Sequence, residues 1–245
     1  MFAIEYCVLF DMINPGLAAL GAPLPLGGTS NHFRTPVLRG VGGWDAWNVT
    51  EDADLGLRLA LFGRRVGALD SDTYEEAPGD LRTWLTQRSR WLMGWMQTLI
   101  VYSRHPRAMV RRMGAVRALC AMVLISSTVL SSLFGPILLA AAMWRTFGPV
   151  GLGAPSTIDV WSTVITLLLL ISGSQATLIG AFIALGNRGL GRLYALLPQF
   201  LAYHALIPIA ARIALIDQLW RPFYWAKTDH GKARTSLRPT IAAAI

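Results

Sequence analysis

Two long uncharged apolar runs constrain the fold of this chain more than any other feature. Residues 119–144 and 160–185 contain no Asp, Glu, Lys or Arg. A helix of about 20 apolar residues crosses the hydrocarbon core of a bilayer, so each run is long enough to span a membrane. Hydrophobic residues make up 53% of the chain, more than in an ordinary soluble domain. The sequence therefore predicts a membrane protein.

The basic residues orient these runs. An arginine cluster without acids immediately precedes the first run and comprises Arg104, Arg107, Arg111, Arg112 and Arg117. Because Lys and Arg are enriched on the cytoplasmic side, we expect the first run to start in the cytoplasm. The net charge of +8 is thus explained by membrane orientation. Nucleic-acid binding is not expected, because the basic residues flank apolar segments instead of forming a stripe with interleaved aromatics.

A third apolar run, residues 193–216, contains prolines and polar residues, and its crossing is less certain from sequence. A full crossing would place the basic tail, residues 217–245, outside the cell, against the positive-inside tendency. Two topologies therefore remain: three crossings, or two crossings with a re-entrant or in-plane third segment. The second, with a cytoplasmic tail, is favoured.

The N-terminal 20 residues are apolar but contain Glu5, Asp11 and Asn14. We interpret this segment as too polar to span, and a helix at the membrane surface or a core helix of the soluble part fits it equally. No basic region precedes its apolar residues, so no signal peptide is apparent. Cys7 and Cys120 have no metal-ligand spacing, and a disulfide framework is not expected.

Three polar islands lie in the part of the chain before the spans. They are residues 27–31 (Gly-Gly-Thr-Ser-Asn), 50–54 (Thr-Glu-Asp-Ala-Asp) and 87–91 (Gln-Arg-Ser-Arg-Trp). The first is a loop rich in Gly that could present backbone N–H groups to a ligand, although on its own a tight connection that binds nothing is the better explanation.

The second island begins a predicted helix, with Thr50 as the N-cap and Gly63 as the stop. Glu51, Asp52 and Asp54 then occupy the first turn, where the helix dipole favours a carboxylate by roughly 0.3–1 kcal/mol. This electrostatic effect explains the acids without a function. A carboxylate at this position also stays ionised, as a general base must.

The third island lies on another predicted helix, which begins after the N-cap Asp80. Its residues Trp84, Arg88, Trp91 and Trp95 fall on one face, typical of an aromatic belt at a membrane boundary or of a sugar-binding face. Between the two helices, residues 64–77 are interpreted as a short strand and a loop.

The order and spacing of the islands resemble the second half of the catalytic domain in membrane-embedded family-2 glycosyltransferases. This group contains bacterial cellulose synthase, hyaluronan synthase and chitin synthase. Its members carry a glycine-serine loop, then Thr-Glu-Asp, then Gln-x-x-Arg-Trp, and residues 26–34, 42–45 and 48–56 resemble its bacterial branch. The resemblance implies an α/β fold class with membrane α-helices. Residues 1–117 would form the C-terminal half of a GT-A type domain with interfacial helices, 118–216 two to three transmembrane helices, and 217–245 a basic aromatic tail.

The resemblance also implies roles for individual residues. Asp52 corresponds to the catalytic base, Glu51 shapes the site, and Asp54 is a second candidate for the base. Arg88 and Arg90 match positions where a guanidinium binds the diphosphate. Substrate-binding roles fall to Gly28, Thr29, Ser30, Gln87 and Trp91, of which Trp91 would carry the acceptor sugar.

The implied function is an inverting glycosyltransferase at the bacterial inner membrane with its catalytic part in the cytoplasm. It would move a sugar from a nucleotide-sugar donor to a growing polysaccharide. The family's Asp motifs for the nucleotide and a divalent metal, Mg²⁺ or Mn²⁺, have no counterpart before Gly27. We therefore expect no metal ligands in this chain, and an incomplete chain that is inactive without the missing half or a subunit that supplies it.

Two alternatives remain open. One is a single transfer onto a lipid-linked acceptor, and the other is a non-catalytic membrane subunit of a polysaccharide synthase. An unrelated transporter would fit the apolar runs but would leave the three islands unexplained.

Overall fold

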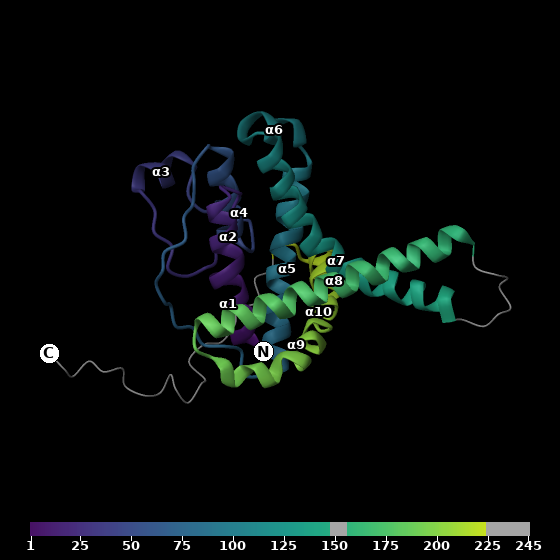
Figure 1. Cartoon of the computed structure of the whole chain (residues 1–245). Helices are drawn as coiled ribbons and strands as arrows, with labels where there is room; N and C mark the ends of the chain where they lie inside the picture. The colour runs from purple at the N-terminus through teal and green to yellow at the C-terminus, as the bar shows by residue number, and fades with distance from the viewer. Residues whose placement is uncertain (148–155, 224–245) are drawn as a thin grey trace.

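A computed structural model describes residues 1–147 and 156–223, and these residues form a helical assembly (Figure 1). The helices are α1 (Phe2–Val8), α2 (Asn14–Ala19), α3 (Thr35–Gly40), α4 (Glu51–Leu61), α5 (Leu81–Ser103), α6 (Pro106–Met113), α7 (Ala115–Phe147), α8 (Thr157–Asn187), α9 (Leu197–His204) and α10 (Ile207–Trp220). A π-helical turn, Leu9–Ile13, joins α1 to α2, and a 3-10 helix, Gly191–Leu196, precedes α9.

The expected α/β half-domain is not seen, because no β-strand occurs in residues 1–147 or 156–223. The strand predicted within residues 64–77 is wrong. This segment is irregular and largely exposed. A strand is stable only when its backbone N–H and C=O groups pair with a neighbour, and no described residue pairs with this segment as a strand.

Within residues 1–147 and 156–223, four helical segments are long and apolar enough to cross a membrane, judged by length and composition. Two of them, Ala115–Arg145 and Thr157–Asn187, cover the uncharged runs and have mean hydropathies of 2.0 and 1.9. The third run falls in Gly191–Trp220, where a turn at residues 205–206 separates α9 from α10. Phe2–Ala19 also qualifies, at a mean hydropathy of 1.2, although its acids led us to expect otherwise.

Helix α5 lies at the centre of the assembly. It packs against α10 and α7, while α8 packs against α7 and α1. Figure 1 shows the C-terminal end of α7 and the N-terminal end of α8 extending away from the other helices. Alanines on α10 (Ala210, Ala211 and Ala214) are fully buried against the α5 residues Trp84, Leu92 and Met96, because small residues let two helix backbones approach closely.

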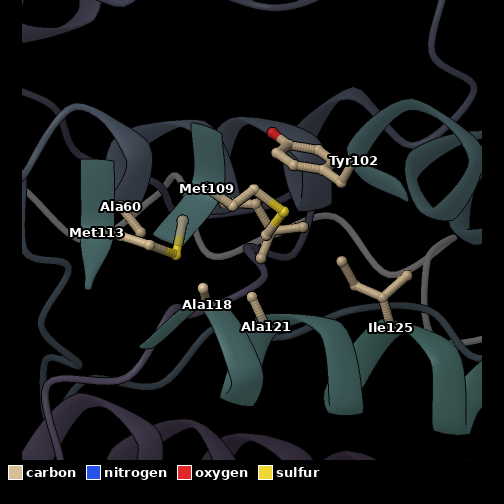
Figure 2. Close-up of a cluster of buried hydrophobic side chains, with 8 residues drawn as sticks. Ala60, Tyr102, Met109, Met113, Ala118, Ala121 and Ile125 are labelled. Atoms are coloured by element: carbon tan, nitrogen blue, oxygen red, sulfur yellow. The ribbon is translucent and has the colours of Figure 1, made fainter. Parts of the chain in front are cut away.

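A second cluster joins α4, α5, α6 and α7 (Figure 2). Met109 and Met113 of the short helix α6 lie against Ala118 and Ala121 at the start of α7. Unbranched Met side chains fill the irregular space that the alanines leave. This packing fixes α6 at the base of the first long apolar helix.

The predicted helix ends are largely confirmed. The Asp80 carboxylate accepts hydrogen bonds from the backbone N–H and the hydroxyl of Thr83, both at 2.8 Å, and so caps α5. Gly63, with φ of 70°, follows the end of α4. Thr50 occupies the N-cap position of α4, but its side chain makes no capping hydrogen bond.

Gly56 allows α4 to pack directly on the segment that leads into the first polar island. A Cβ atom at Gly56 would lie 2.1 Å from the carbonyl oxygen of Leu24, a contact with backbone that no rotamer change relieves. Gly56→Ala should therefore lower the free energy of unfolding by about 1–3 kcal/mol, as overpacked cores do.

Thermal unfolding of the detergent-solubilised protein measures this effect. Gly173→Ala in α8 is the matched control, because nothing lies within 4 Å of a Cβ atom built there. Equal melting temperatures for the two variants would contradict the close packing at Gly56.

Candidate active site

The first polar island lies against the start of α4. A Cβ atom at Gly28 would be 3.1 Å from Asp52 Oδ2, so the Gly28 backbone directly adjoins this carboxylate. The loop is closed by a hydrogen bond from the Asn31 side chain to the Gly27 carbonyl. Any larger residue at position 28 would displace the carboxylate or the loop, which explains a glycine at this point.

The hydroxyls of the same loop face another segment. Thr29 donates a hydrogen bond to the Glu75 carboxylate, and Ser30 Oγ lies 2.6 Å from Thr73 Oγ1. The loop is therefore held between the start of α4 and the irregular segment that follows α4. In this arrangement Thr29 and Ser30 bond to protein groups, and their contact with a substrate stays a prediction.

The residues just before α4 are hydrogen-bonded to α5. Gln97 Oε1 accepts from the Val49 backbone N–H at 3.1 Å, and Asn48 Nδ2 donates to Thr98 Oγ1 at 3.0 Å. The Thr50 side chain also lies where a Cβ atom at Gly94 would be, with Oγ1 only 2.1 Å from that position. The Thr-Glu-Asp turn is thus fixed on the helix that carries the third island.

Gln97 also contacts the chain that leaves α10. Its Nε2 donates to the Pro222 carbonyl at 2.6 Å, and Phe223 lies edge-to-face with Trp47 at a centroid distance of 5.6 Å. One side chain therefore connects the turn before α4 with the end of the last helix.

Asp52 and Asp54 have different surroundings, although both lie in the first turn of α4. Asp52 is half-buried, and its Oδ1 accepts a hydrogen bond from Trp44 Nε1 at 3.0 Å. Burial raises the pKa of Asp52, and the bond from Trp44 acts in the opposite direction. No cation within the described ranges forms an ion pair with this carboxylate, so it can accept a proton from a ligand.

Asp54 is buried and fully engaged. It forms an ion pair with Arg58 one turn along α4 and accepts a hydrogen bond from the Tyr102 hydroxyl at 3.1 Å. Arg58 also donates to the Gly43 carbonyl at 2.8 Å. The second candidate for the base is therefore committed to holding α4 on α5 and on the loop before it.

The second and third islands interact electrostatically, through Glu51 and Arg90. Burial lowers the pKa of Arg90, and the nearby Glu51 carboxylate opposes this shift. A guanidinium remains protonated in proteins at neutral pH, so Arg90 supplies a positive charge beside the first turn of α4. The structure thus places Gly28 beside Asp52 and Arg90 near Glu51, and their roles in substrate binding stay predictions.

Arg88 is used differently. Its two terminal nitrogens donate to the two carboxylate oxygens of Glu5 at 2.7 and 2.6 Å, and the Tyr203 hydroxyl donates to the same carboxylate at 2.7 Å. The guanidinium lies 5.2 Å from the ring centroid of Trp84 and 4.8 Å from that of Trp91. Arg88 therefore connects α1, α5 and α9, and its contact with a diphosphate stays a prediction.

Gln87 and Trp91 lie one turn apart on α5 and are half-buried. Trp91 contacts Phe2 of α1, with 6.4 Å between ring centroids. The indole is thus held between α1 and Arg88, and a role as the platform for an acceptor sugar remains a prediction, as does the role of Gln87.

The described residues offer no metal site of the expected kind. No group of three or more His, Cys, Asp or Glu side chains lies close enough to hold an ion in residues 1–147 or 156–223. Asp52 and Asp54 spell Asp-x-Asp, but the Asp54 carboxylate is taken by Arg58 and Tyr102. No chemical step is therefore assigned to a metal bound by this chain.

The sequence reasoning missed several residues that shape the site. Trp44 lies within residues 42–45, which resemble the family's bacterial branch, but the sequence predicts no role at the site for Trp44, Gln97 or Glu5. Gln97 and Glu5 contact segments far apart in the chain, and the contact of Trp44 with Asp52 spans an irregular loop, so no periodicity or spacing signals any of the three.

Comparison with known proteins identifies the family. The model of glycosyl transferase family group 2 matches residues 11–183, which is most of the chain. The chain belongs to this family. All three islands lie within the matched range, and so do α7 and most of α8.

One curated relative supports this assignment. The chain is 35% identical over 72 residues to a probable glycosyltransferase of Sulfolobus acidocaldarius, and the alignment covers 29% of this chain and 16% of the relative. The chain thus matches only a small part of the length of this larger glycosyltransferase. No solved structure matches the chain.

The Arg88 network generates a stability prediction. Arg88→Gln leaves the Glu5 carboxylate, whose side chain is 19% exposed, without its cation. Breaking such a pair should lower the free energy of unfolding by about 3 kcal/mol. Glu5→Gln should cost a similar amount, and the double variant much less than the sum.

Chemical unfolding in mild detergent measures the four-variant cycle. Arg82→Gln serves as the control, because Arg82 lies exposed on the same helix. Additive effects of Glu5→Gln and Arg88→Gln would show that the two charges are not coupled.

Proposed function

We propose that this family-2 glycosyltransferase chain forms the acceptor side of an inverting, membrane-bound transferase of the cellulose synthase and hyaluronan synthase branch. The sugar would come from a nucleotide-sugar donor and pass to a growing polysaccharide at the cytoplasmic face of a bacterial inner membrane. The observation that carries this proposal is the contrast between Asp52 and Asp54, since only Asp52 has a carboxylate available to a substrate.

Asp52 performs the proton transfer in this mechanism. Inversion requires that the acceptor hydroxyl oxygen attacks the anomeric carbon opposite the leaving group. As the new C–O bond forms, the hydroxyl proton passes to the Asp52 carboxylate, and the bond between the sugar and the nucleoside diphosphate breaks with its electron pair going to the diphosphate. The Trp44 N–H holds Oδ1, and Oδ2 lies on the side of Gly28, where the acceptor hydroxyl would approach.

Arg90 and Trp91 complete the site on α5. Arg90 lies beside Glu51 and supplies positive charge for the departing diphosphate. Trp91 offers an aromatic ring for the apolar face of the acceptor sugar, and Gln87 one turn earlier orients it by hydrogen bonds. Because Gly94 lets Thr50 lie directly on α5, proton acceptor and positive charge stay at a fixed separation.

The groups that bind the nucleotide of the donor would lie outside the three islands. The strands and Asp motifs that bind the nucleotide and a Mg²⁺ or Mn²⁺ ion in the family would belong to another segment or to a partner subunit. This chain is then one part of the working enzyme, consistent with the small share of the Sulfolobus relative that it matches.

Asp52→Asn tests the role of the base directly. General-base assistance is worth about 10²–10⁴ in rate, so the variant should lose transfer by that factor. The carboxamide has nearly the same shape, and the melting temperature should stay within a degree or two. Radiolabelled sugar transfer in membranes that contain the natural polypeptide and its partners measures the rate.

Asp54→Asn is the matched control, since it should lower the melting temperature by leaving Arg58 without its carboxylate. Normal turnover by Asp52→Asn would refute the assignment of the base, and no transfer by the wild type would favour a non-catalytic subunit. If the product is a lipid that carries one added sugar, the acceptor is a lipid-linked molecule and not a growing polysaccharide.

Trp44→Phe tests the orientation of the base. The variant keeps an aromatic ring but removes the N–H that bonds to Asp52 Oδ1. Because this bond lowers the pKa of Asp52, its loss should raise the pKa further. The acidic limb of the pH profile of kcat/KM should therefore move to higher pH, with a lower kcat at neutral pH. An unchanged pH profile with reduced activity would leave Trp44 only a packing role.

A further inference from the structure

A basic surface hollow lies where α5 meets α6, and no residue of the three islands lines it. The hollow is lined by Arg104, His105, Pro106, Arg107, Ala108 and Arg111. Its three arginine side chains are exposed, and none of them forms an ion pair or a side-chain hydrogen bond within residues 1–147 and 156–223.

Several other arginines of the chain are neutralised by an acid. Arg58, Arg88 and Arg188 each pair with an Asp or Glu side chain. The arginines of the hollow instead lie close together without an acid, and like charges repel one another at this range. An anion in the hollow would remove that repulsion and receive the planar, paired hydrogen bonds that guanidinium groups offer to phosphate.

The position of the hollow indicates the source of the anion. Helix α6 is held on the start of α7 by Met109 and Met113, which pack on Ala118 and Ala121 (Figure 2). The segment able to cross a membrane begins at Ala115, only four residues beyond Arg111. Gly114 alone separates the end of α6 at Met113 from the start of α7.

Exposed apolar side chains continue the same surface. Val110 is 45% exposed, Val116 75% and Leu119 64%, which suits contact with lipid more than with water. With α7 in the bilayer, the hollow therefore lies at the level of the lipid headgroups. Basic residues at this level attract anionic lipids by about 1 kcal/mol each.

We propose that the hollow formed by Arg104, Arg107 and Arg111 binds the phosphate of an anionic phospholipid headgroup. The site holds one lipid beside α6 and anchors the junction of α5 and α6 at the membrane surface. The proposal rests on the membrane placement of α7 and not on sugar transfer, so the two can fail separately.

Native mass spectrometry of the full chain in detergent, titrated with phosphatidylglycerol or phosphatidylcholine, tests the proposal. The wild type should retain phosphatidylglycerol about tenfold more tightly than phosphatidylcholine, as expected for a few arginine contacts that are partly screened. The variant Arg104→Gln/Arg107→Gln/Arg111→Gln should lose this preference while its affinity for phosphatidylcholine stays unchanged.

The control variant is Arg39→Gln/Arg64→Gln/Arg65→Gln, which removes the same charge from exposed arginines elsewhere. It should keep the preference, and a variant with lysine at the three positions of the hollow should keep part of it. Because the hollow arginines are exposed, all variants should fold, and an unchanged elution volume in size exclusion verifies this.

Three results would overturn the proposal. The first is an undiminished preference for phosphatidylglycerol in the hollow variant, and the second is an equal loss in the control variant. The third is displacement of phosphatidylglycerol by inorganic phosphate at similar concentration, which would make the hollow a site for a soluble anion.

Discussion

The packing of the Thr-Glu-Asp turn on α5 is the constraint on which the candidate site depends. Gly94 removes the side chain that would clash with Thr50, and Gln97 holds the Val49 N–H at 3.1 Å. A helix start is normally an adaptable place, because its first N–H groups lack partners within the helix. Here the residues before it are bonded to a long neighbouring helix, so Asp52 and Arg90 cannot drift apart without breaking these contacts. The site is thus as rigid as the α4–α5 pair.

Environment, not residue type, separates the two carboxylates of α4. The helix dipole favours both as anions, and nothing in their spacing distinguishes a base from a structural acid. The structure separates them by partners: Arg58 and Tyr102 occupy Asp54, whereas Asp52 accepts one hydrogen bond from Trp44. A group that already forms an ion pair gains little by accepting a proton, while a half-buried carboxylate beside a neutral donor is ready to do so.

Features that depend on local sequence were the predictable ones. The uncharged runs, the cap at Asp80 and the stop at Gly63 follow from hydropathy and helix-end chemistry, and the family motifs identified the islands that come together. Contacts between distant segments were not predictable: nothing in the sequence around Arg88 indicates that its guanidinium donates to Glu5 at 2.6 Å. The strand expected within residues 64–77 failed for the same reason, since strands require partners that a local pattern does not reveal. The acids of Phe2–Ala19 likewise suggested a segment too polar to span, because their partners Arg88 and Arg188 come from later in the chain.

The bond from Gln97 to the Pro222 carbonyl has a consequence for biogenesis. Pro222 follows the last helix, so during synthesis it emerges well after α4 and α5. Until α10 has packed on α5, the side chain that holds the Val49 N–H lacks its second anchor, and the alanine face of α10 does not yet cover Trp84 and Met96. The Thr-Glu-Asp turn therefore gains its last anchor only after α10 has been made, although its own residues are made early. A chain whose synthesis stops before α10 would contain all three islands. It would still lack the contact between Gln97 and Pro222.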